Sequence, residues 1–368
     1  MAEEYQRLRQ LFLKRLGIEP EEETDEKWLQ FLKDWQKVAG IGEAFAEPLL
    51  ERASILAATC LTIGREALRE RRFDWAIIDE AGRATAPELL VPLVRARRAI
   101  LVGDEKQLPP MVDGELSNKE LSSVGVTRES LAESLFGTLV KEAQEAGLPI
   151  VQMLTAQHRM HPAIGRLISQ VFYEGKLENA VTEQERRHEL TWVPKCVTWY
   201  VTTRLPGHEE TPRGSSFYNR VEVEQCLHLL RRMEAGYRAL GQRREVAVIS
   251  PYNAQIAELR TAIRPDGPDW HALHITIAAV DAFQGQDSDL VLYSLVRSNQ
   301  QARLGFLRDY RRLNVALSRA RQLLLLIGDL KTLENGKESG GEENPYRRLI
   351  TYMRDHDEDC AIEYLEEV

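Results

Sequence analysis

The sequence predicts an α/β protein with parallel sheets, and three observations carry that prediction. From Ile55 onward, short apolar runs alternate with amphipathic segments, which is the pattern of parallel strands joined by crossover helices. Two of these runs, WAIIDE at 75–80 and ILVGDE at 100–105, end in acidic residues, as strands do where an open sheet binds ligands. The chain has 368 residues, which is too many for one ordinary domain, so two cores are expected.

The composition is that of a folded protein and excludes several classes. Apolar residues make up 43% of the chain and charged residues 29%. No run approaches the roughly 18 apolar residues of a membrane span, and the start, MAEEYQRLRQ, is too polar for a secretory signal. We therefore expect an intracellular, cytoplasmic protein with no membrane partner. The net charge of −9 argues against coating nucleic acid by bulk electrostatics, but a local basic groove would not show in that total.

The first elements can be assigned in order. Residues 1–52 are expected to form two helices separated by the acidic stretch 21–26, because their apolar residues recur at three- and four-residue spacing. A strand is then expected at 75–78, a helix from about 87 to 94, and a strand at 100–102. Thr85 and Glu88 form a capping box for that helix.

The pattern restarts after Leu154. A second series of strands, with helices between them, is expected at 197–201, 246–249, 290–295 and 323–327. Beyond residue 330 the chain turns Gly- and Glu-rich, which indicates one short helix and an acidic tail. The predicted organisation is a helical segment at 1–52, an α/β domain at 53–155, a second α/β domain at 156–332 and a C-terminal tail at 333–368.

Two polar turns follow the strands of the first domain. In FDWAIIDEAGRATAPE a buried strand delivers Asp79 and Glu80 to a sheet edge, where a nucleoside triphosphatase would use them to hold Mg²⁺ and to orient the attacking water. In AILVGDEKQLPP the next strand ends at Asp104, and Gln107 would lie near the phosphate end of a nucleotide. Each has a simpler interpretation: an acidic pair ending a strand at solvent, and a turn closed by Gly103.

The segment LTAQHRMHP offers an arginine between two histidines. Arg159 has the planar, forked guanidinium that suits phosphate oxygens. His158 and His161 are three residues apart, so a metal site is conceivable, but ordinary hydrogen-bonded histidines are favoured. The four cysteines lie far apart with no C-x-x-C pair, so neither a zinc cluster nor a disulfide framework is expected.

Three further segments belong to the second domain. VAVISPYNAQ is a strand that runs into a polar turn, and VDAFQGQDSD contains the tight loop with Gly285 and Asp287. RRLNVALSRARQLLLLIGD predicts a helix followed by a very apolar strand, with Arg312 and Arg319 on one helix face and Arg321 pointing elsewhere. A simple glycine-bearing connection and a solvated basic helix are the alternatives here.

Taken in order, these six stretches resemble superfamily 1B helicases, in the branch typified by the RNA helicase of nonsense-mediated mRNA decay and by senataxin. The likeness runs from about Ile55 to Leu330. QHRMHP, VDAFQGQDSD and RRLNVALSRAR are close to family signatures, and FYEGKL, SSFYNRVEVE and GFLRDYRR agree as well. The resemblance implies two RecA-like domains, the first incomplete, after the remnant of a helical stalk. It further implies ATP and Mg²⁺ in a cleft between the domains and single-stranded nucleic acid, RNA or DNA, across the top.

The resemblance also implies roles for individual residues. Carried over by position, the metal residue would be Asp79, the catalytic base Glu80, the γ-phosphate sensor Gln107 with Asp104 beside the cofactor, the arginine fingers Arg159 and Arg319, the adenine contact His158, and the coupling residues Gly285 and Asp287. Two positions depart from the family. Asp287 replaces the usual glutamate, so a shorter side chain must reach the same partner, and His158 replaces a tyrosine that relatives often stack on the adenine.

One family motif is missing. The phosphate-binding loop G-x-x-x-x-G-K-[ST] cradles phosphates with its backbone amides and its lysine, and no segment of this sequence matches it. The leading interpretation is a helicase motor portion separated from its loop by a split gene, a truncation or an alternative start. Little ATPase activity is then expected from the chain alone, and a second polypeptide is a possible source of the loop. A non-hydrolysing nucleic-acid-binding or scaffold protein is the alternative, which the four retained catalytic residues disfavour.

Overall fold

The computed structural model describes residues 50, 52–65, 68, 70–111, 127–336 and 344–366. The two helices expected before residue 50 lie outside the described residues. The chain divides into two compact units, one with residues 1–76 and 90–99 and one with residues 77–89 and 100–368. All the site residues that the sequence predicts, from Asp79 to Arg319, belong to the second unit. Within the described part of the chain, no helix has the length and apolar character needed to cross a bilayer.

The first strand, helix and strand confirm the predicted order. After the short 3-10 helix η2 (Thr62–Gly64), β1 (Phe73–Ile78) pairs with β2 (Ala96–Leu101), and α4 (Ala86–Leu93) connects them. The Phe73 amide donates to the Arg95 carbonyl at 2.8 Å, and the Val102 amide donates to the Ile78 carbonyl at 2.8 Å, so the two strands run in the same direction. β2 begins at Ala96, before the strand that the sequence predicts. Its first three residues are Ala-Arg-Arg, which do not belong to the apolar run.

The capping box and the next helices follow. The Thr85 amide and hydroxyl both donate to the Glu88 carboxylate at 2.8 Å, which confirms the predicted cap of α4. Two further helices are α6 (Arg128–Ala132) and α7 (Leu135–Glu145). Ser134 caps α7 by accepting a hydrogen bond from the Gly137 amide.

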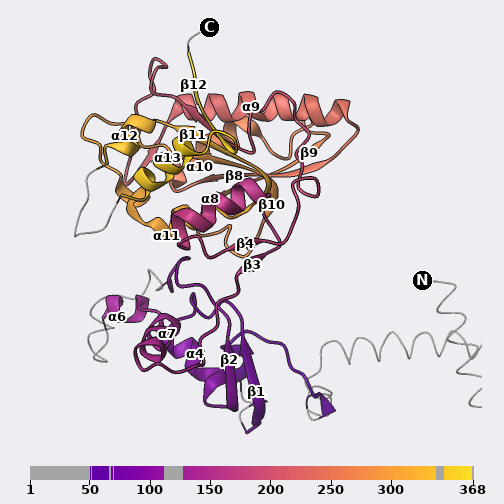
Figure 1. Cartoon of the computed structure of the whole chain (residues 1–368), viewed down its shortest axis with the longest axis vertical. Coiled ribbons are helices and arrows are strands. Elements are labelled where there is room, and N and C mark those ends of the chain that lie inside the picture. The colour runs from indigo at the N-terminus through magenta and orange to yellow at the C-terminus, as the bar shows by residue number, and fades with distance from the viewer. Residues whose placement is uncertain are drawn as a thin grey trace, which may run out of the picture. The chain divides into compact units, whose positions relative to one another are not determined.

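The largest sheet has six strands in the order β12-β5-β11-β10-β8-β9, and every neighbouring pair is parallel (Figure 1). Its strands are β5 (Val197–Val201), β8 (Arg244–Ser250), β9 (Leu273–Ala279), β10 (Ser288–Ser294), β11 (Ala320–Gly328) and β12 (Cys360–Tyr364). The strands expected in the second domain are thereby confirmed. Shorter elements are β3 (Ala156–Gln157), β4 (Glu178–Asn179), β6 (Thr211–Arg213), β7 (Ser216–Tyr218) and the 3-10 helix η4 (Gly305–Arg308).

Helices cover both faces of this sheet, so its central strands are buried on both sides. One face packs against α8 (Pro162–Phe172), α11 (Tyr310–Leu317), α12 (Leu330–Glu334) and α13 (Pro345–Asp355), and the other packs against α9 (Arg220–Ala239) and α10 (Asn253–Ile263). Successive residues of β10 alternate between the two cores: Val291 and Tyr293 join the first, whereas Leu290 and Leu292 join the second. Figure 1 shows α8 and α9 on opposite faces of the sheet.

Two expectations differ from the structure. The segment expected to be a tail includes α13 and β12, and β12 pairs with β5 from Cys360↔Val197 to Tyr364↔Val201. Its acidic composition masks a strand, because an edge strand needs only one apolar face, supplied here by Cys360 and Ile362.

The second difference concerns the basic helix. The helix expected to carry Arg312 through Arg321 ends at Leu317, and Ser318 is its C-cap. Arg319 lies in the turn that follows and Arg321 on β11, so Arg312 and Arg319 do not share a helix face. The chain leaves the helix here because the Arg319 carbonyl joins the sheet ladder, accepting from the Ser288 amide at 3.0 Å.

Candidate active site

The loops after β1 and β2 lie against each other because both contain glycine. The Ala81 amide donates to the Val102 carbonyl at 2.8 Å, which joins the two loops directly. A Cβ atom added to Gly103 would stand 2.7 Å from the Gly82 amide nitrogen, and one added to Gly82 would stand 3.1 Å from the Asp104 carbonyl oxygen. Only glycine fits this approach. The acidic pair after β1 and the polar turn after β2 are therefore neighbours.

Asp79 and Glu80 are both exposed at the end of β1. Glu80 has a φ of 53°, a left-handed conformation that residues other than glycine rarely adopt. Its amide donates to the Asp79 carboxylate at 2.9 Å, which stabilises this local turn. The Gln284 amide group approaches the Glu80 carboxylate at 3.5 Å. Non-glycine residues with such backbone conformations cluster at functional sites, so this geometry is consistent with the predicted role of Glu80.

Gln107 lies between a carboxylate and a guanidinium. Its side-chain amide nitrogen donates to Asp104 at 2.8 Å, and its amide oxygen accepts from Arg319 at 2.9 Å. Asp104 also accepts from the Lys106 amide at 2.9 Å, which fixes the turn after β2. Both ends of the Gln107 amide are therefore held, and its orientation follows from its partners.

Arg319 is a buried cation surrounded by neutral acceptors. Its residue surface is 2% exposed. Besides Gln107, its guanidinium donates to the carbonyls of Val315 at 3.1 Å and Gln286 at 3.3 Å and to the Ser318 hydroxyl at 3.3 Å. Among the described residues, no carboxylate forms an ion pair with it. Burial, followed by the nearby charge of Arg159, lowers the pKa of Arg319 to about 10, so the guanidinium remains charged at neutral pH.

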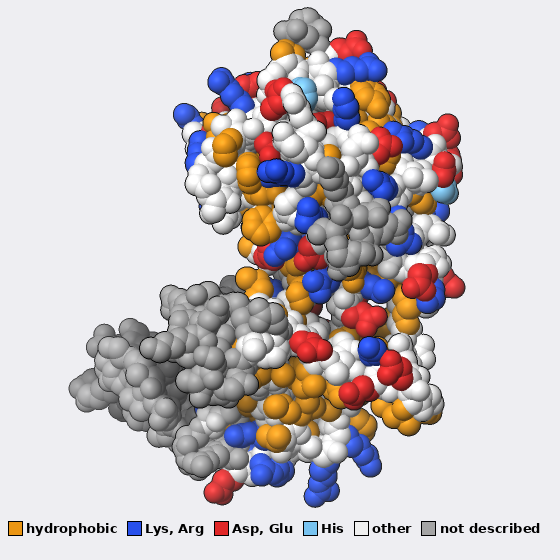
Figure 2. Space-filling model, turned by 90° about the vertical axis from the view of Figure 1, so that its left-hand side faces the viewer, with side chains coloured by type: hydrophobic (Ala, Val, Ile, Leu, Met, Phe, Trp, Pro, Cys, Tyr) orange, Lys and Arg blue, Asp and Glu red, His pale blue; other side chains and the backbone are white. Residues whose placement is uncertain are grey.

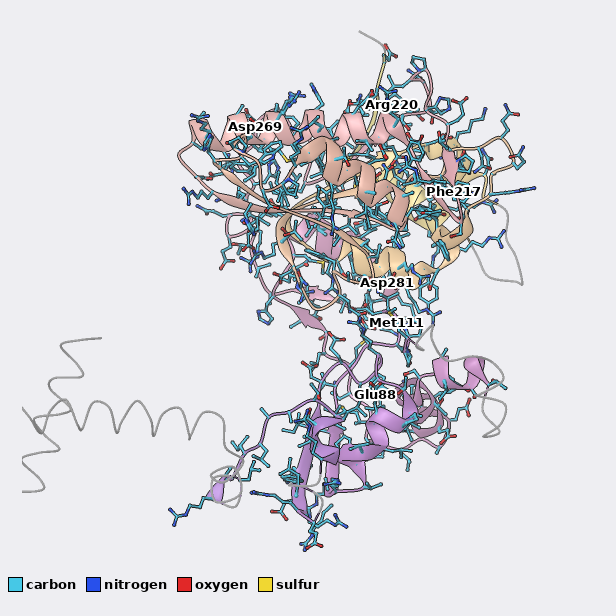
Figure 3. The ribbon with its side chains drawn as sticks, turned by 180° about the vertical axis from the view of Figure 1, so that it is seen from behind. Glu88, Met111, Phe217, Arg220, Asp269 and Asp281 are labelled. Atoms are coloured by element: carbon cyan, nitrogen blue, oxygen red, sulfur yellow. The ribbon has the colours of Figure 1, made fainter. Side chains whose placement is uncertain are left out.

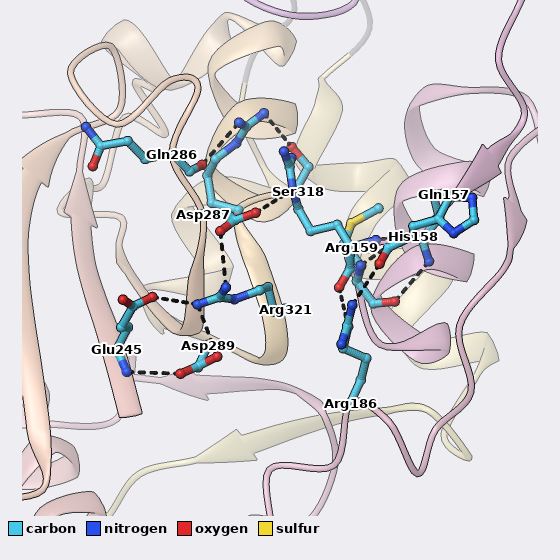
Figure 4. Close-up of polar contacts among 12 residues, drawn as sticks. Gln157, His158, Arg159, Arg186, Glu245, Gln286, Asp287, Asp289, Ser318 and Arg321 are labelled. Carbon is cyan, nitrogen blue, oxygen red and sulfur yellow. Dashed lines mark hydrogen bonds and ion pairs between the residues drawn. The ribbon is translucent and has the colours of Figure 1, made fainter. Parts of the chain in front are cut away.

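Arg159 and Asp287 form the second half of the site (Figure 4). The Arg159 guanidinium donates to the Asp287 carboxylate at 3.0 Å. Arg321 approaches the same carboxylate at 3.6 Å and also pairs with Asp289 at 3.2 Å and Glu245 at 2.5 Å. Two arginines and three carboxylates thus meet where β8, β10 and β11 begin. Asp287 thus orients the Arg159 guanidinium, and Arg321 approaches from the same sheet edge.

The turn that carries Arg159 is fixed through its backbone. Arg186 donates to the carbonyls of Arg159 at 2.7 Å and His158 at 2.8 Å, and the Gln157 side chain accepts from the Arg159 amide at 3.0 Å (Figure 4). The His158 side chain is exposed, so only its backbone is joined to the rest of this group. Gly285 has a φ of 79°, which favours glycine at this loop position.

His161 caps the start of α8. Its Nδ1 atom accepts from the Ala163 amide at 3.1 Å at the start of α8, and its other ring nitrogen lies 3.5 Å from the Cys196 sulfur. Burial lowers the pKa of His161. In the part of the chain that the structure describes, no group of three or more His, Cys, Asp or Glu side chains could hold a metal ion.

Two more residues contact this group: Asn314, which the sequence places on the basic helix, and Tyr173, which the sequence does not single out. The Tyr173 hydroxyl donates to the Asp104 carboxylate and accepts from the Asn314 side chain at 2.8 Å. Asn314 also donates to the Lys106 carbonyl at 2.9 Å. Burial and the Asp104 charge raise the pKa of Tyr173, so its hydroxyl keeps its proton. The signal was present in the sequence, because Tyr173 belongs to FYEGKL and Asn314 to RRLNVALSRAR.

The charged groups of this site have the chemistry that a triphosphate and its cation need. Arg319 supplies a desolvated positive charge, and Arg159 supplies a second one that is partly exposed. The exposed Asp79 is the residue that would hold a hard cation such as Mg²⁺ through oxygen. The Gln284 side-chain oxygen is buried without a hydrogen-bond partner among the described residues, next to Glu80. An acceptor and donors thus converge beside the exposed carboxylates.

Comparison with known sequences agrees with this chemistry. Two sequence models, both described as an AAA domain, match residues 12–115 and 131–331. The chain is 35% identical to "Regulator of nonsense transcripts 1 homolog" of Drosophila melanogaster over 88% of this chain and 26% of that protein. It is 35% identical to "Helicase sen1" of Schizosaccharomyces pombe over 78% of this chain and 16% of that protein. The chain therefore belongs to the AAA-domain family, in the branch of superfamily 1 helicases related to nonsense-mediated decay and senataxin.

The solved structures are more distant, and the overlap with relatives is partial. "Crystal structure of Arterivirus nonstructural protein 10 (helicase)" shares 15% sequence identity, covers 69% of this chain and 38% of that chain, and gives a TM-score of 0.31. "The structure of PRRSV helicase" shares 17% identity, covers 71% of this chain and 36% of that chain, and gives a TM-score of 0.32. The chain spans about a quarter or less of the length of the two curated relatives named above.

Proposed function

We propose that this chain forms the catalytic part of an ATP-dependent helicase or translocase that acts on single-stranded nucleic acid. The observation that supports this most is Arg319. Arg319 is 2% exposed, and among the described residues its guanidinium donates hydrogen bonds to neutral acceptors alone, an arrangement that is costly unless an anion joins it. Its neighbours include the γ-phosphate-sensing candidate Gln107, so a nucleotide phosphate is the ligand that fits its charge and position.

The catalytic roles follow from the chemistry of each group. Glu80 accepts the proton of the attacking water, and Gln107 contacts the terminal phosphate through the amide that otherwise contacts Arg319. Arg319 and Arg159 neutralise the charge that develops on the transferring phosphoryl group. Asp79 would hold Mg²⁺, which supplies charge neutralisation when bound.

The remaining residues orient this group or couple it to the strand. Asp104 fixes the turn that carries Gln107, and Asp287 orients Arg159 through their ion pair. Gly285 permits the turn that places Asp287. The exposed imidazole of His158 stacks on the base of the nucleotide, with less overlap than a tyrosine offers.

Hydrolysis also needs a phosphate-binding loop. Because residues 1–368 contain no G-x-x-x-x-G-K-[ST] segment, we propose that the loop is supplied from outside these residues. Residues 53–155 then form the domain that receives it, and residues 156–332 form the domain that supplies the arginines. ATP and Mg²⁺ are the cofactors of the completed motor, and RNA or DNA single strands are its partner.

The test is strand-stimulated ATP turnover in an extended chain. Residues 1–368 would be extended at the N-terminus by the strand, loop and helix of a relative such as "Helicase sen1" of Schizosaccharomyces pombe. Turnover should fall about 10²- to 10⁴-fold in Glu80→Gln and about 10³- to 10⁵-fold in Arg319→Ala. Arg220→Ala is the matched control, since its exposed side chain pairs with Glu224 on the same helix, α9. Strand binding without turnover in the extended chain would support the non-hydrolysing alternative.

A further inference from the structure

A short segment before α11 presents aromatic and arginine side chains together. We call Arg303, Phe306, Arg308 and Tyr310 the aromatic–arginine platform. Phe306 is 55% exposed and Tyr310 is 38% exposed, and both arginines are exposed as well. Exposed aromatic rings with basic side chains interleaved between them are typical of single-strand-binding surfaces.

Phe306 is fixed in position by the side chain beneath it. Its ring lies 5.7 Å from the ring of Tyr252, which is 1% exposed. The Tyr252 hydroxyl donates to the Leu304 carbonyl at 3.3 Å, and Gly305, with a φ of 58°, leaves no room for a Cβ atom beside that hydroxyl. Phe217, labelled in Figure 3, packs edge-on against the same tyrosine at 5.7 Å. The chain therefore holds Phe306 outward on a rigid aromatic base.

The charge around the platform is positive, although the chain as a whole carries −9. Arg312 lies 5.7 Å from the Phe306 ring centre and Arg311 lies 5.9 Å from the Tyr310 ring centre. The carboxylates that pair with Arg311 and Arg312 are Asp309 and Asp281. Counting Arg303, Arg308, Arg311 and Arg312 against these two aspartates gives a local charge of four minus two, or +2. This is the local basic surface that the total charge conceals.

Arg311 and Arg312, which follow the platform directly in the sequence, lie beside the candidate active site. Arg311 lines a cavity of about 270 Å³ together with Gly82, Gln107 and Pro109. Arg312 pairs with Asp281, labelled in Figure 3, whose backbone carbonyl accepts from Arg83 in the loop after β1 at 3.4 Å. The two arginines that follow the platform in the sequence thus contact the loops that carry the candidate active site.

We propose that the aromatic–arginine platform binds single-stranded nucleic acid, with Phe306 and Tyr310 stacking on bases and Arg303 and Arg308 contacting phosphates. The proposal rests on the proposed function, because it names the residues that recognise the strand. A protein partner fits less well, since Arg308 and Asp309 lie between the two exposed rings in the sequence and charged residues are depleted in the cores of protein interfaces. Stacking tolerates any base, so RNA and DNA should both bind.

The test is equilibrium binding of short labelled single strands to the full chain, without nucleotide, followed by fluorescence anisotropy. Phe306→Ala should weaken binding about five- to 100-fold, the range of one lost stacking contact. Arg308→Ala should lower the slope of log affinity against log salt by about 0.7, the value for one phosphate contact. Tyr364→Ala and Arg204→Ala are matched controls: Tyr364 is 43% exposed with Arg204 4.4 Å from its ring centre, on the edge strand β12.

A comparison of strands with and without bases separates a loss of stacking from a general loss of structure. The unmodified chain should bind a strand with bases more tightly than an abasic strand of the same length. Phe306→Ala should abolish that difference, Arg308→Ala should retain it, and Phe306→Trp should retain it with quenching of the new indole. Thermal melts of each variant check that the fold is intact.

Three outcomes of these binding measurements distinguish the platform from the proposed function. If the unmodified chain binds strands and Phe306→Ala binds with unchanged affinity and base dependence, the platform is wrong and the proposed function stands. If the unmodified chain binds neither RNA nor DNA strands, the proposed function fails and the platform fails with it. Loss of base dependence confined to Phe306→Ala supports the platform.

Discussion

The two parallel sheets of this chain have similar strands in different surroundings. In β1, Trp75 is 49% exposed and Ile77 is 72% exposed, whereas in β10 Leu292 and Tyr293 are fully buried. β10 has a strand on each side and helices on both faces, while β1 pairs only with β2 among the described strands. Figure 2 shows hydrophobic side chains gathered on the surface of the chain. An apolar strand is therefore stabilising only to the degree that neighbours cover it.

This comparison also shows how the candidate site is distributed. Glu80 and Gln107 lie on the loops of the two-stranded sheet, whereas Arg159, Asp287 and Arg319 lie at the edge of the six-stranded sheet. The contacts between Gln107 and Arg319 and between Tyr173 and Asp104 join the two sets. The six-stranded sheet thus carries the two arginines, Arg159 and Arg319. The loops of the two-stranded sheet carry the Glu80 carboxylate and the Gln107 amide.

The largest predicted effect contrasts one buried and one exposed strand residue. Leu292→Ala should lower the free energy of unfolding by about 2–5 kcal/mol, because it removes a buried side chain and leaves a cavity. Ile77→Ala should change it by less than about 0.5 kcal/mol, because that side chain is 72% exposed. Chemical denaturation followed by circular dichroism measures both. Similar losses for the two variants would contradict the contrast.

The second prediction concerns the fully buried carboxyl group of Glu222, which lies on α9 beside the six-stranded sheet. Glu222 on α9 accepts from the Ser294 hydroxyl at 2.6 Å and the Val296 amide at 2.9 Å, and burial raises its pKa to about 8. The folded chain thus keeps a proton that the unfolded chain loses near the ordinary value of 4.5. The contribution of Glu222 to stability is complete below that value and is lost as pH rises towards about 8.

Between pH 6.5 and 7.5, the free energy of unfolding of the unmodified chain should therefore fall by about 1 kcal/mol more than that of Glu222→Gln. Burial lowers the pKa of the buried His161 and lowers that of the half-buried His188 to about 4, and the pH dependence that these histidines add is present in both variants and cancels in the comparison. Urea denaturation at the two pH values gives the difference in slope. Parallel pH profiles would show that Glu222 is ionised in the folded chain.

The smallest effect tests the helix of the two-stranded sheet. Thr85→Ala removes the side-chain half of the capping box and should destabilise α4 by about 1 kcal/mol. Hydrogen exchange of peptides covering 86–93 should become faster, while exchange in β10 and β11 stays unchanged. Faster exchange throughout the large sheet would mean that the two regions unfold together.

Much of the fold could be predicted from the sequence, because local patterns determine it. Apolar runs located β5, β8, β10 and β11, and the Thr85 and Glu88 pair located the start of α4. The end of α11 was missed because Ser318, Arg319 and Ala320 are compatible with a helix, and only the sheet ladder decides otherwise. β12 was missed because an acidic edge strand has a weak pattern.

The site was predicted as a set of residues and not as a geometry. Sequence order placed Asp79, Glu80 and Gln107 at strand ends, which the parallel sheet brings together. The burial of Arg319 and its contact with Gln107 depend on residues 212 positions apart, and local sequence carries no signal of that pairing. The role of Tyr173 depends equally on a partner 69 positions away.

The most direct test of the central claim is Mg²⁺-dependent ATP turnover by residues 1–368 alone, with and without single strands. The account predicts turnover at background level that Glu80→Gln leaves unchanged, because the carboxylates and arginines lack a loop that binds the phosphates. Brisk turnover by the same preparation, abolished in Glu80→Gln, would contradict the claim that the loop must come from outside these residues.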